Sequence, residues 1–345
     1  MDNLQKALNR TISDLDEKYR GKRKFGRSML FLARDVVTCG LVYHALSDAN
    51  YVLYSTVMGT AMIGLWVLGH ECGHGAFGDH AWQNDCVGFV LHSSLLVPYF
   101  SWKYSHNKHH KYTNHLILGE THVPSTQASY RAIRRVVGED AFALVDVVLH
   151  VAFGWPMYLL FNATGGRTQA DLTTRLVKGV NKSHFTSKSQ VMIPTRNVEI
   201  STLGCGVTLG LLLYWDLVGM YAGPYLVVNA WLVLYTWLQH THPDVPHYGT
   251  DDFTFLKGAL ATIDRPYPYL IDQMHHHIGT THVLHHLNYA IPHYRAEEYT
   301  RAIKQVLGPA YRYDPTPIYT ALYRTARKCV YVESTHGTQY YKSLM

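Results

Sequence analysis

The sequence has few charged residues and no cysteine pattern of the kind that builds disulfide or zinc frameworks. Asp, Glu, Lys and Arg make up 16% of the 345 residues, against 47% hydrophobic residues, which is a low charge content for a soluble protein. The five cysteines form no C-x-x-C pair and are predicted to be free thiols in a reducing compartment. The net charge of +6 is spread thinly outside one N-terminal run, which argues against nucleic-acid binding and favours a membrane.

Long stretches without charge predict membrane-spanning helices. Residues 51–70 contain no Asp, Glu, Lys or Arg, and this length can cross the hydrocarbon core as a helix. Between Glu199 and Asp244 the only such charge is Asp216. The small-residue sequence YAGP at 221–224 is expected to divide this stretch into a hairpin of two spans.

Three further apolar segments are less clear. Residues 29–46 contain Arg34 and Asp35, so they span only if Arg34 reaches the interface or pairs with Asp35. Residues 87–99 are too short to cross, and residues 141–161 contain polar interruptions. Both are expected to lie at the membrane interface or to pack inside the protein, and the alternative is that one of them crosses the membrane. The basic run at 18–27 predicts a cytosolic N-terminus.

Histidine is the residue in excess, with 23 copies. Three clusters have spacings that place imidazoles on one side of a helix: His70 and His74; His106, His109 and His110; His282, His285 and His286. Eight neutral imidazoles exceed what one zinc ion accepts, so two metal ions are predicted. Because imidazole suits iron, copper, zinc and nickel, the spacing leaves the metal open.

Other residues are candidates to complete this centre. His240, at the end of the last predicted span, is the best ninth ligand, with His242 second. Histidine ligands are commonly oriented by a carboxylate on their other ring nitrogen, and Glu71 and Asp264 are candidates for that role.

We therefore expect an all-α integral membrane protein, with about four transmembrane helices capped by a cytosolic helical domain that holds a histidine-rich di-metal site. Its expected parts are a basic cytosolic N-terminus (1–27), a first transmembrane hairpin (28–70), cytosolic and interfacial helices with the first two histidine clusters (71–199), a second hairpin (200–240) and a cytosolic C-terminal region with the third cluster (241–345).

Beyond the clusters, several segments resemble the membrane-bound fatty acid desaturases, in particular the oleate delta-12 and omega-3 enzymes. The resemblance extends roughly from Trp66 to Glu333. It rests on the histidine clusters together with LLVPYFSWKYSHNKHH (95–110), GWPMYLLFNATG (154–165), LQHTHPDVPHY (238–248), KGALATIDR (257–265), THVLHHLNYAIPHY (281–294) and YVE (331–333). It implies that the eight clustered histidines, with His240 added, bind two non-haem iron ions.

The resemblance also implies a reaction in which O2 and two electrons remove two hydrogens from adjacent methylenes of a fatty acyl lipid or acyl-CoA. The electrons would come from an external donor of the cytochrome b5 or ferredoxin type, usually cytochrome b5 with its NADH-dependent reductase. The expected location is the endoplasmic reticulum membrane, multi-pass, with both termini cytosolic. An apolar slot must accept the acyl chain, and its candidate residues are Trp66, Tyr99, Trp102 and Leu284.

Departures from the family pattern also occur. Gly75 stands where plant relatives often have a further histidine, and Asn288 and Tyr289 stand where Phe and Ser are frequent. The segment GETHVP (119–124) is more similar to microbial delta-12 enzymes, which favours conversion of oleate to linoleate.

Alternatives within the family are omega-3 desaturation, hydroxylation, epoxidation and acetylenic-bond formation. A histidine-rich metal transporter and a haem protein are more distant alternatives. A transporter would place ligands at mid-bilayer, whereas these clusters lie at or beyond the ends of the predicted spans.

Overall fold

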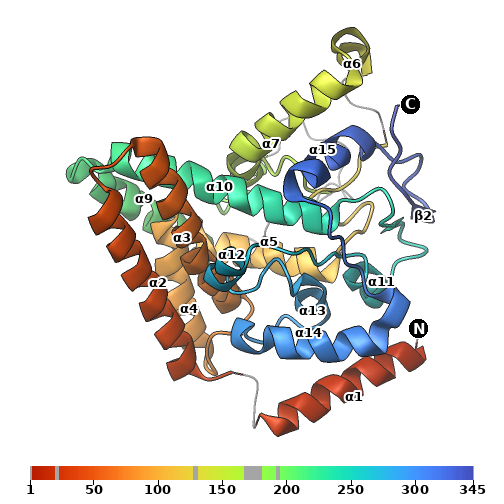
Figure 1. Ribbon diagram of the computed structural model, residues 1–345, viewed down its shortest axis with the longest axis horizontal. Coiled ribbons are helices and arrows are strands. Elements are labelled where there is room, and N and C mark those ends of the chain that lie inside the picture. The colour runs from red at the N-terminus through yellow and green to blue at the C-terminus, as the bar shows by residue number, and fades with distance from the viewer. Residues whose placement is uncertain (1, 20–22, 127–130, 167–180, 192–194, 345) are drawn as a thin grey trace.

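The structure is a computed structural model that describes residues 2–19, 23–126, 131–166, 181–191 and 195–344. Their regular secondary structure is helical (Figure 1), apart from the two-residue strands β1 (His247–Tyr248) and β2 (Thr338–Gln339), which pair antiparallel. The predicted all-α fold is confirmed.

Five helices of the described chain are long and apolar enough to cross a membrane: α2 (Phe25–Leu46), α3 (Tyr51–Gly73), α7 (Glu139–Phe161), α9 (Arg196–Tyr214) and α10 (Val218–His240). Four of them correspond to the predicted spans. The fifth, α7, packs against α10 and against α15 (Ile318–Lys328). Its expected place at the membrane interface stays a prediction.

The helices α3 and α10 lie against each other and run in the same direction. The Tyr51 hydroxyl donates to the Gly219 carbonyl oxygen near the start of both helices, and Trp231 Nε1 donates to Thr60 Oγ1 further along, at 3.1 Å. Their last turns therefore lie at the same end of the molecule. This parallel packing brings the histidines at the two C-terminal ends together.

The predicted break at 221–224 is wrong. The chain turns at residues 215–217 instead, where Asp216 adopts a φ of 54°, and Pro224 lies inside α10. The small residues allow close helix packing, because a Cβ on Gly223 would clash with Ser55 Oγ. They were misread as a turn because small residues also mark helix–helix contacts in membranes.

Arg34 and Asp35 lie within one continuous helix, α2. Arg34 Nη2 and Asp35 Oδ1 are 2.7 Å apart, and the Asp35 side chain is 5% exposed against 39% for that of Arg34. The Arg34–Asp35 pair, which the sequence required for residues 29–46 to span, is therefore present.

The remaining helices cover and connect these long ones. The segment 87–99 is divided between α4 (Ala81–Ser94) and α5 (Tyr99–Lys111), and α4 packs against α3 and α9. The other helices are α1 (Asp2–Lys18), α6 (Arg131–Val137), α11 (Phe255–Ala259), α12 (Tyr269–Met274), α13 (His282–Leu287), α14 (His293–Leu307) and the 3-10 helix η1 (Gly308–Ala310).

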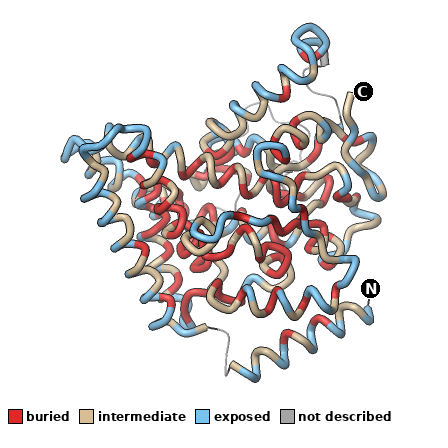
Figure 2. Tube along the Cα trace, in the orientation of Figure 1, coloured by how far each residue is buried: buried red, intermediate tan, exposed pale blue. Residues whose placement is uncertain are grey.

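Figure 2 shows that buried residues concentrate where α3, α5, α10 and α13 meet, while the outer side of α2 is exposed. That outer side is apolar, with Leu30, Val36, Val37 and Leu41 each more than half exposed. A large exposed apolar surface of this kind marks contact with lipid or with another protein, and for α2 we assign it to lipid.

Candidate metal centre

The first histidine cluster lies where α3 ends. The helix starts with a cap, in which Asn50 Oδ1 accepts hydrogen bonds from the Val52 and Leu53 N–H groups at 3.0 and 3.3 Å, as expected for an N-cap asparagine. Gly75, with a φ of +68°, lies just beyond its C-terminal end, in the left-handed conformation that glycine adopts without strain. His70 and His74 therefore sit on the last turn and at its end.

Nine histidines from four helices form two adjacent groups. Group A consists of His70, His74, His106, His110 and His285, whose nearest ring nitrogens all lie within 4.8 Å of one another. Group B consists of His109, His240 and His286, grouped on the same criterion, together with His282, whose Nε2 lies 3.0 Å from His240 Nε2. The structure thus brings together all nine predicted ligands.

Helical spacing explains how α5 and α13 serve both groups. In each helix the first and last histidines of H-x-x-H-H are four residues apart, on one face, and the middle one projects from a neighbouring face. On α5 the outer pair, His106 and His110, joins group A, and His109 joins group B. On α13 the arrangement is reversed, because His285 joins group A while the outer pair joins group B.

The distances between facing nitrogens fit metal coordination. His106 Nε2 lies 2.8 Å from His70 Nε2 and 3.1 Å from His110 Nε2, and His109 Nε2 lies 3.2 Å from His240 Nε2. Neighbouring imidazoles bound to one ion at about 2.1 Å would have their nitrogens about 3.0 Å apart at right angles. Nitrogens converging on one point at this spacing form a set of donors for a shared cation.

The imidazoles of the clusters are neutral; six of the nine residues are buried, and His74, His106 and His285 are partly buried. All four group B rings are less than 9% exposed. Burial lowers the pKa of His109 to about 4 and that of His285 to about 3, because a charged imidazole is poorly solvated there. Neutral imidazole is the form that binds metals, so the site holds its ligands ready for binding near pH 7.

Hydroxyl groups orient two rings of group B. Thr113 Oγ1 donates to the His109 carbonyl oxygen at 2.8 Å and lies 3.0 Å from His286 Nδ1. Since its single proton is already donated, it must accept one from Nδ1–H, which leaves His286 Nε2 free to bind a metal. Thr121 Oγ1 lies 3.1 Å from His109 Nδ1. Sequence reasoning missed both threonines, although Thr113 lies one helical turn after His109.

Comparison with known proteins agrees with this geometry. The family described as fatty acid desaturase matches residues 49–316. A Delta(12)-fatty-acid desaturase from Arabidopsis thaliana is 39% identical over 90% of this chain and 84% of its own. The chain belongs to the fatty acid desaturase family. It is similarly close to an omega-6 fatty acid desaturase from Brassica juncea, 37% identical over 90% and 84% of the two chains, and to an oleoyl-12-hydroxylase from Ricinus communis, 36% identical over 92% and 84%.

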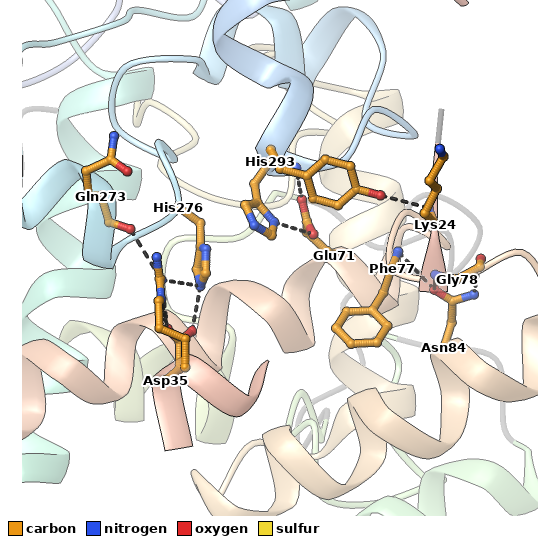
Figure 3. A network of polar contacts seen from close by, with 11 residues as sticks. Lys24, Asp35, Glu71, Phe77, Gly78, Asn84, Gln273, His276 and His293 are labelled. Carbon is orange, nitrogen blue, oxygen red and sulfur yellow. Dashed lines mark hydrogen bonds and ion pairs between the residues drawn. The ribbon is translucent and has the colours of Figure 1, made fainter. Parts of the chain in front are cut away.

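Glu71 of this desaturase-family enzyme does not orient a ligand ring in the way we expected. One of its carboxylate oxygens accepts from the His293 N–H, and the other lies 2.9 Å from His293 Nδ1, as Figure 3 shows. The His293 and His276 rings are 4.2 Å apart, and His276 Nε2 lies 2.6 Å from Asp35 Oδ2. This network ties α2 and α3 to the chain on either side of the third cluster.

Asp264 likewise acts on the backbone. It accepts from the Val283 N–H at 2.8 Å and from the Tyr311 hydroxyl, and so fixes the start of α13. Burial raises the pKa of its carboxyl group to about 7. From the sequence we expected Glu71 and Asp264 to accept hydrogen bonds from ligand imidazoles. Instead, Glu71 bonds to His293, and Asp264 bonds to the Val283 N–H and the Tyr311 hydroxyl. In the described chain, His70 Nδ1 and His110 Nδ1 have no hydrogen-bond partner.

Two of the predicted acyl-slot residues border group A. The Trp102 ring stacks on His106 at 4.5 Å, and the Trp66 ring stacks on His70 at 5.4 Å. Leu284 is 1% exposed and borders a small cavity of about 20 Å³ beside His70 and His285. Tyr99 is buried one layer further out, with its hydroxyl 3.2 Å from Asp85 Oδ1. Their role in substrate binding stays a prediction.

Proposed function

We propose that the nine imidazoles bind two iron ions and that the enzyme introduces a second cis double bond, at the delta-12 position, into a monounsaturated acyl chain. The observation that supports this most strongly is the convergence of nine imidazoles, six of them buried, at the ends of two membrane helices. Unactivated methylenes have no acidic proton, so acid–base groups alone cannot start the reaction, and a bound di-iron centre supplies the O2-derived oxidant.

The residues of the chain hold and shield this centre. Conversion of one –CH2–CH2– unit to –CH=CH– consumes one O2, two electrons and two protons and yields two waters. Trp66 and Trp102 cover group A with apolar surface, which excludes water from the reacting carbons. The helices α3, α5, α10 and α13 fix the positions of the nine rings, which would hold bound metal ions at a defined place relative to the acyl chain.

We place the acyl chain in an apolar cavity of about 390 Å³ between α7, α9 and α10. Leu159 and Phe185 belong to its wall, and Leu159 packs in the same hydrophobic cluster as Trp66 and Trp102. The cavity therefore borders the hydrophobic cluster that contains the aromatic cover of group A. Its chemistry fits a hydrocarbon chain that enters from the bilayer.

The electron donor in this proposal is cytochrome b5 with its NADH-dependent reductase, and the location is the endoplasmic reticulum membrane. One supporting observation is that the Brassica juncea relative is named as an endoplasmic reticulum enzyme. We propose that both termini, residues 71–199 and residues 241–345 face the cytosol. The basic run at 18–27 supports this orientation through the excess of positive charge on cytosolic loops.

Expression in a yeast strain without polyunsaturated lipids tests the proposal. Analysis of fatty acid methyl esters is expected to show 18:2 with double bonds at positions 9 and 12. Formation of 18:3 only, from supplied linoleate, would identify an omega-3 desaturase instead.

Hydroxylation is the second candidate, because a relative named oleoyl-12-hydroxylase is 36% identical to this chain. One oxidant can either abstract a second hydrogen or transfer oxygen, so both products can come from the same ligands. A 12-hydroxy acid as the main product in the same yeast experiment would replace the desaturase proposal.

A further inference from the structure

A cavity of about 540 Å³, with lysine, asparagine and histidine side chains in its wall, reaches group A from the side of the molecule where α3 ends and α4 begins. Two group A histidines, His74 and His110, belong to its wall. The rest of the wall comes from the end of α3, from α5, from the starts of α4 and α11, and from Tyr289, which follows α13. This cavity is distinct from the apolar cavity between α7, α9 and α10, because no residue lines both.

Tyr289 connects this cavity to group A. Its ring centroid lies 4.8 Å from that of His74 and 5.1 Å from that of His110, while 38% of the residue is exposed. One aromatic side chain thus contacts two ligand rings and the protein surface. Electron tunnelling weakens steeply with distance, so a conjugated ring at this position shortens the gap between a surface-bound donor and the metal ligands.

The cavity has a cationic rim. Lys103 and Lys111 line it, and Arg23 Nη1 donates to the Gly75 carbonyl oxygen at its edge. Arg23 belongs to the basic run at 18–27, of which residues 20–22 lie outside the described chain. The opposing charge is Asp85, whose Oδ1 is 2.6 Å from Lys103 Nζ. A rim of three cations and one carboxylate attracts an acidic partner.

We propose that this cavity is the docking site of the electron donor, an acidic one-electron carrier protein, and that Tyr289 couples the donor to group A. The inference rests on the proposed function and adds the place where electrons enter. Each docking event oxidises one donor by one electron and lowers the oxidation state of the di-iron centre by one. Two events complete one turnover, and the two protons come from water.

A lipid phosphate group is the competing occupant for a cationic cavity. Phosphate recognition uses cations and N–H donors but gives no reason for an aromatic ring in contact with two ligand rings. The contact of Tyr289 with His74 and His110 therefore favours an electron carrier.

Binding measurements test the docking surface without depending on turnover. The soluble haem domain of cytochrome b5 is titrated onto the full chain in lipid nanodiscs, both with and without bound metal. We expect Lys103→Glu/Lys111→Glu to raise Kd at least tenfold and to remove most of its salt dependence. Lys111→Glu alone is measured as well, because a glutamate at position 103 would lie beside Asp85. The matched control is Lys328→Glu, an exposed cation on α15, which should bind as the wild type does.

Unchanged donor affinity in both rim variants would overturn the docking site. An increase in the KM for the acyl lipid, with donor affinity unchanged, would also overturn it and would assign the cavity to a lipid headgroup.

Reduction kinetics test Tyr289. We expect Tyr289→Leu to slow reduction of the metal centre by bound cytochrome b5 at least tenfold, with the Kd for the donor and the rate of reduction by dithionite unchanged. Tyr289→Phe keeps the ring, so its metal centre should be reduced at close to the wild-type rate. The same is expected of the control Tyr319→Leu, at a 77% exposed tyrosine. A wild-type rate in Tyr289→Leu would contradict the coupling.

Single-turnover product formation with dithionite and O2 separates the two proposals. If the wild type forms no product under these conditions, the proposed function fails. If it forms product but rim and Tyr289 variants take electrons from cytochrome b5 normally, only the present inference fails.

Discussion

Groups A and B have the same ligand chemistry but different surroundings. Three of the five group A rings, His74, His106 and His285, are partly exposed, and His74 borders a cavity open to the surface. All four group B rings are buried, and threonine hydroxyls orient two of them. One half of the centre is therefore accessible, and the other is held in place by burial and hydrogen bonds. We propose that electrons and oxygen reach the centre through group A and that group B is the anchored partner.

Removal of one ligand from either group is expected to have the largest effect. His285→Ala in group A and His286→Ala in group B should both abolish product, because each deprives an ion of one of its few nitrogen donors. Fatty acid analysis measures the product, and membrane fractionation shows whether the protein is inserted. His336→Ala, at an exposed histidine, is the control and should retain activity. Product from either ligand variant would remove that residue from the centre.

A change in pH should affect both groups alike, because burial sets the pKa in each. The folded-state pKa values of His109 (about 4) and His285 (about 3) lie below the usual histidine value of 6.5. The unfolded chain therefore binds protons below about pH 6.5 that the folded chain does not, and stability falls as the pH is lowered. Each ring should contribute roughly 2 kcal/mol of loss between pH 7 and pH 5.

The apparent melting temperature of the metal-free protein in detergent measures this loss. It should decrease steadily from pH 7 to pH 5, and the metal-loaded protein should resist the change because metal binding competes with protonation. A melting temperature that stays constant over this range in the metal-free protein would show that the rings are not held neutral by burial.

Loss of the Thr113 hydroxyl should weaken group B selectively. Thr113→Val removes the acceptor for His286 Nδ1–H, and loss of such a partner typically costs 10–100-fold in metal affinity. When a chelator is added to the purified variant, half of the bound metal, the ion of group B, should be lost before the other half. Thr113→Ser keeps the hydroxyl and should behave as the wild type. Equal loss from both metal positions would erase the distinction between the groups.

The smallest effect is expected at Glu71, beside group A. Glu71→Gln keeps the hydrogen bond to the His293 N–H but removes the charge, at a cost of about 1–3 kcal/mol. The melting temperature should fall by a few degrees while product formation persists. Asp79→Asn, at an exposed carboxylate, is the control. Abolished activity with an unchanged melting temperature would show that Glu71 acts in the chemistry itself.

The sequence was sufficient to predict four of the five candidate membrane helices and the convergence of the nine histidines, because length without charge and the 3- and 4-residue spacings are local signals. The division of those histidines between two groups was not predicted. It depends on which faces of α5 and α13 meet, and on the parallel packing of α3 and α10, which are tertiary facts. The break at 221–224 was misplaced for the same reason, since Gly223 is small in order to pack against Ser55.

The partners of the carboxylates were also beyond local reasoning. The Glu71 contact to His293 joins residues 222 positions apart, and no spacing rule connects them. Tyr289 was noted only as a departure from the family pattern, whereas the fold places it between the surface and two group A rings.

The metal content of the purified protein tests the central claim most directly. Elemental analysis per chain, combined with a visible absorption spectrum, should give about two irons and no haem Soret band, because two groups of neutral imidazoles provide separate sites for two ions. One zinc ion per chain, or a strong Soret band, would contradict the account.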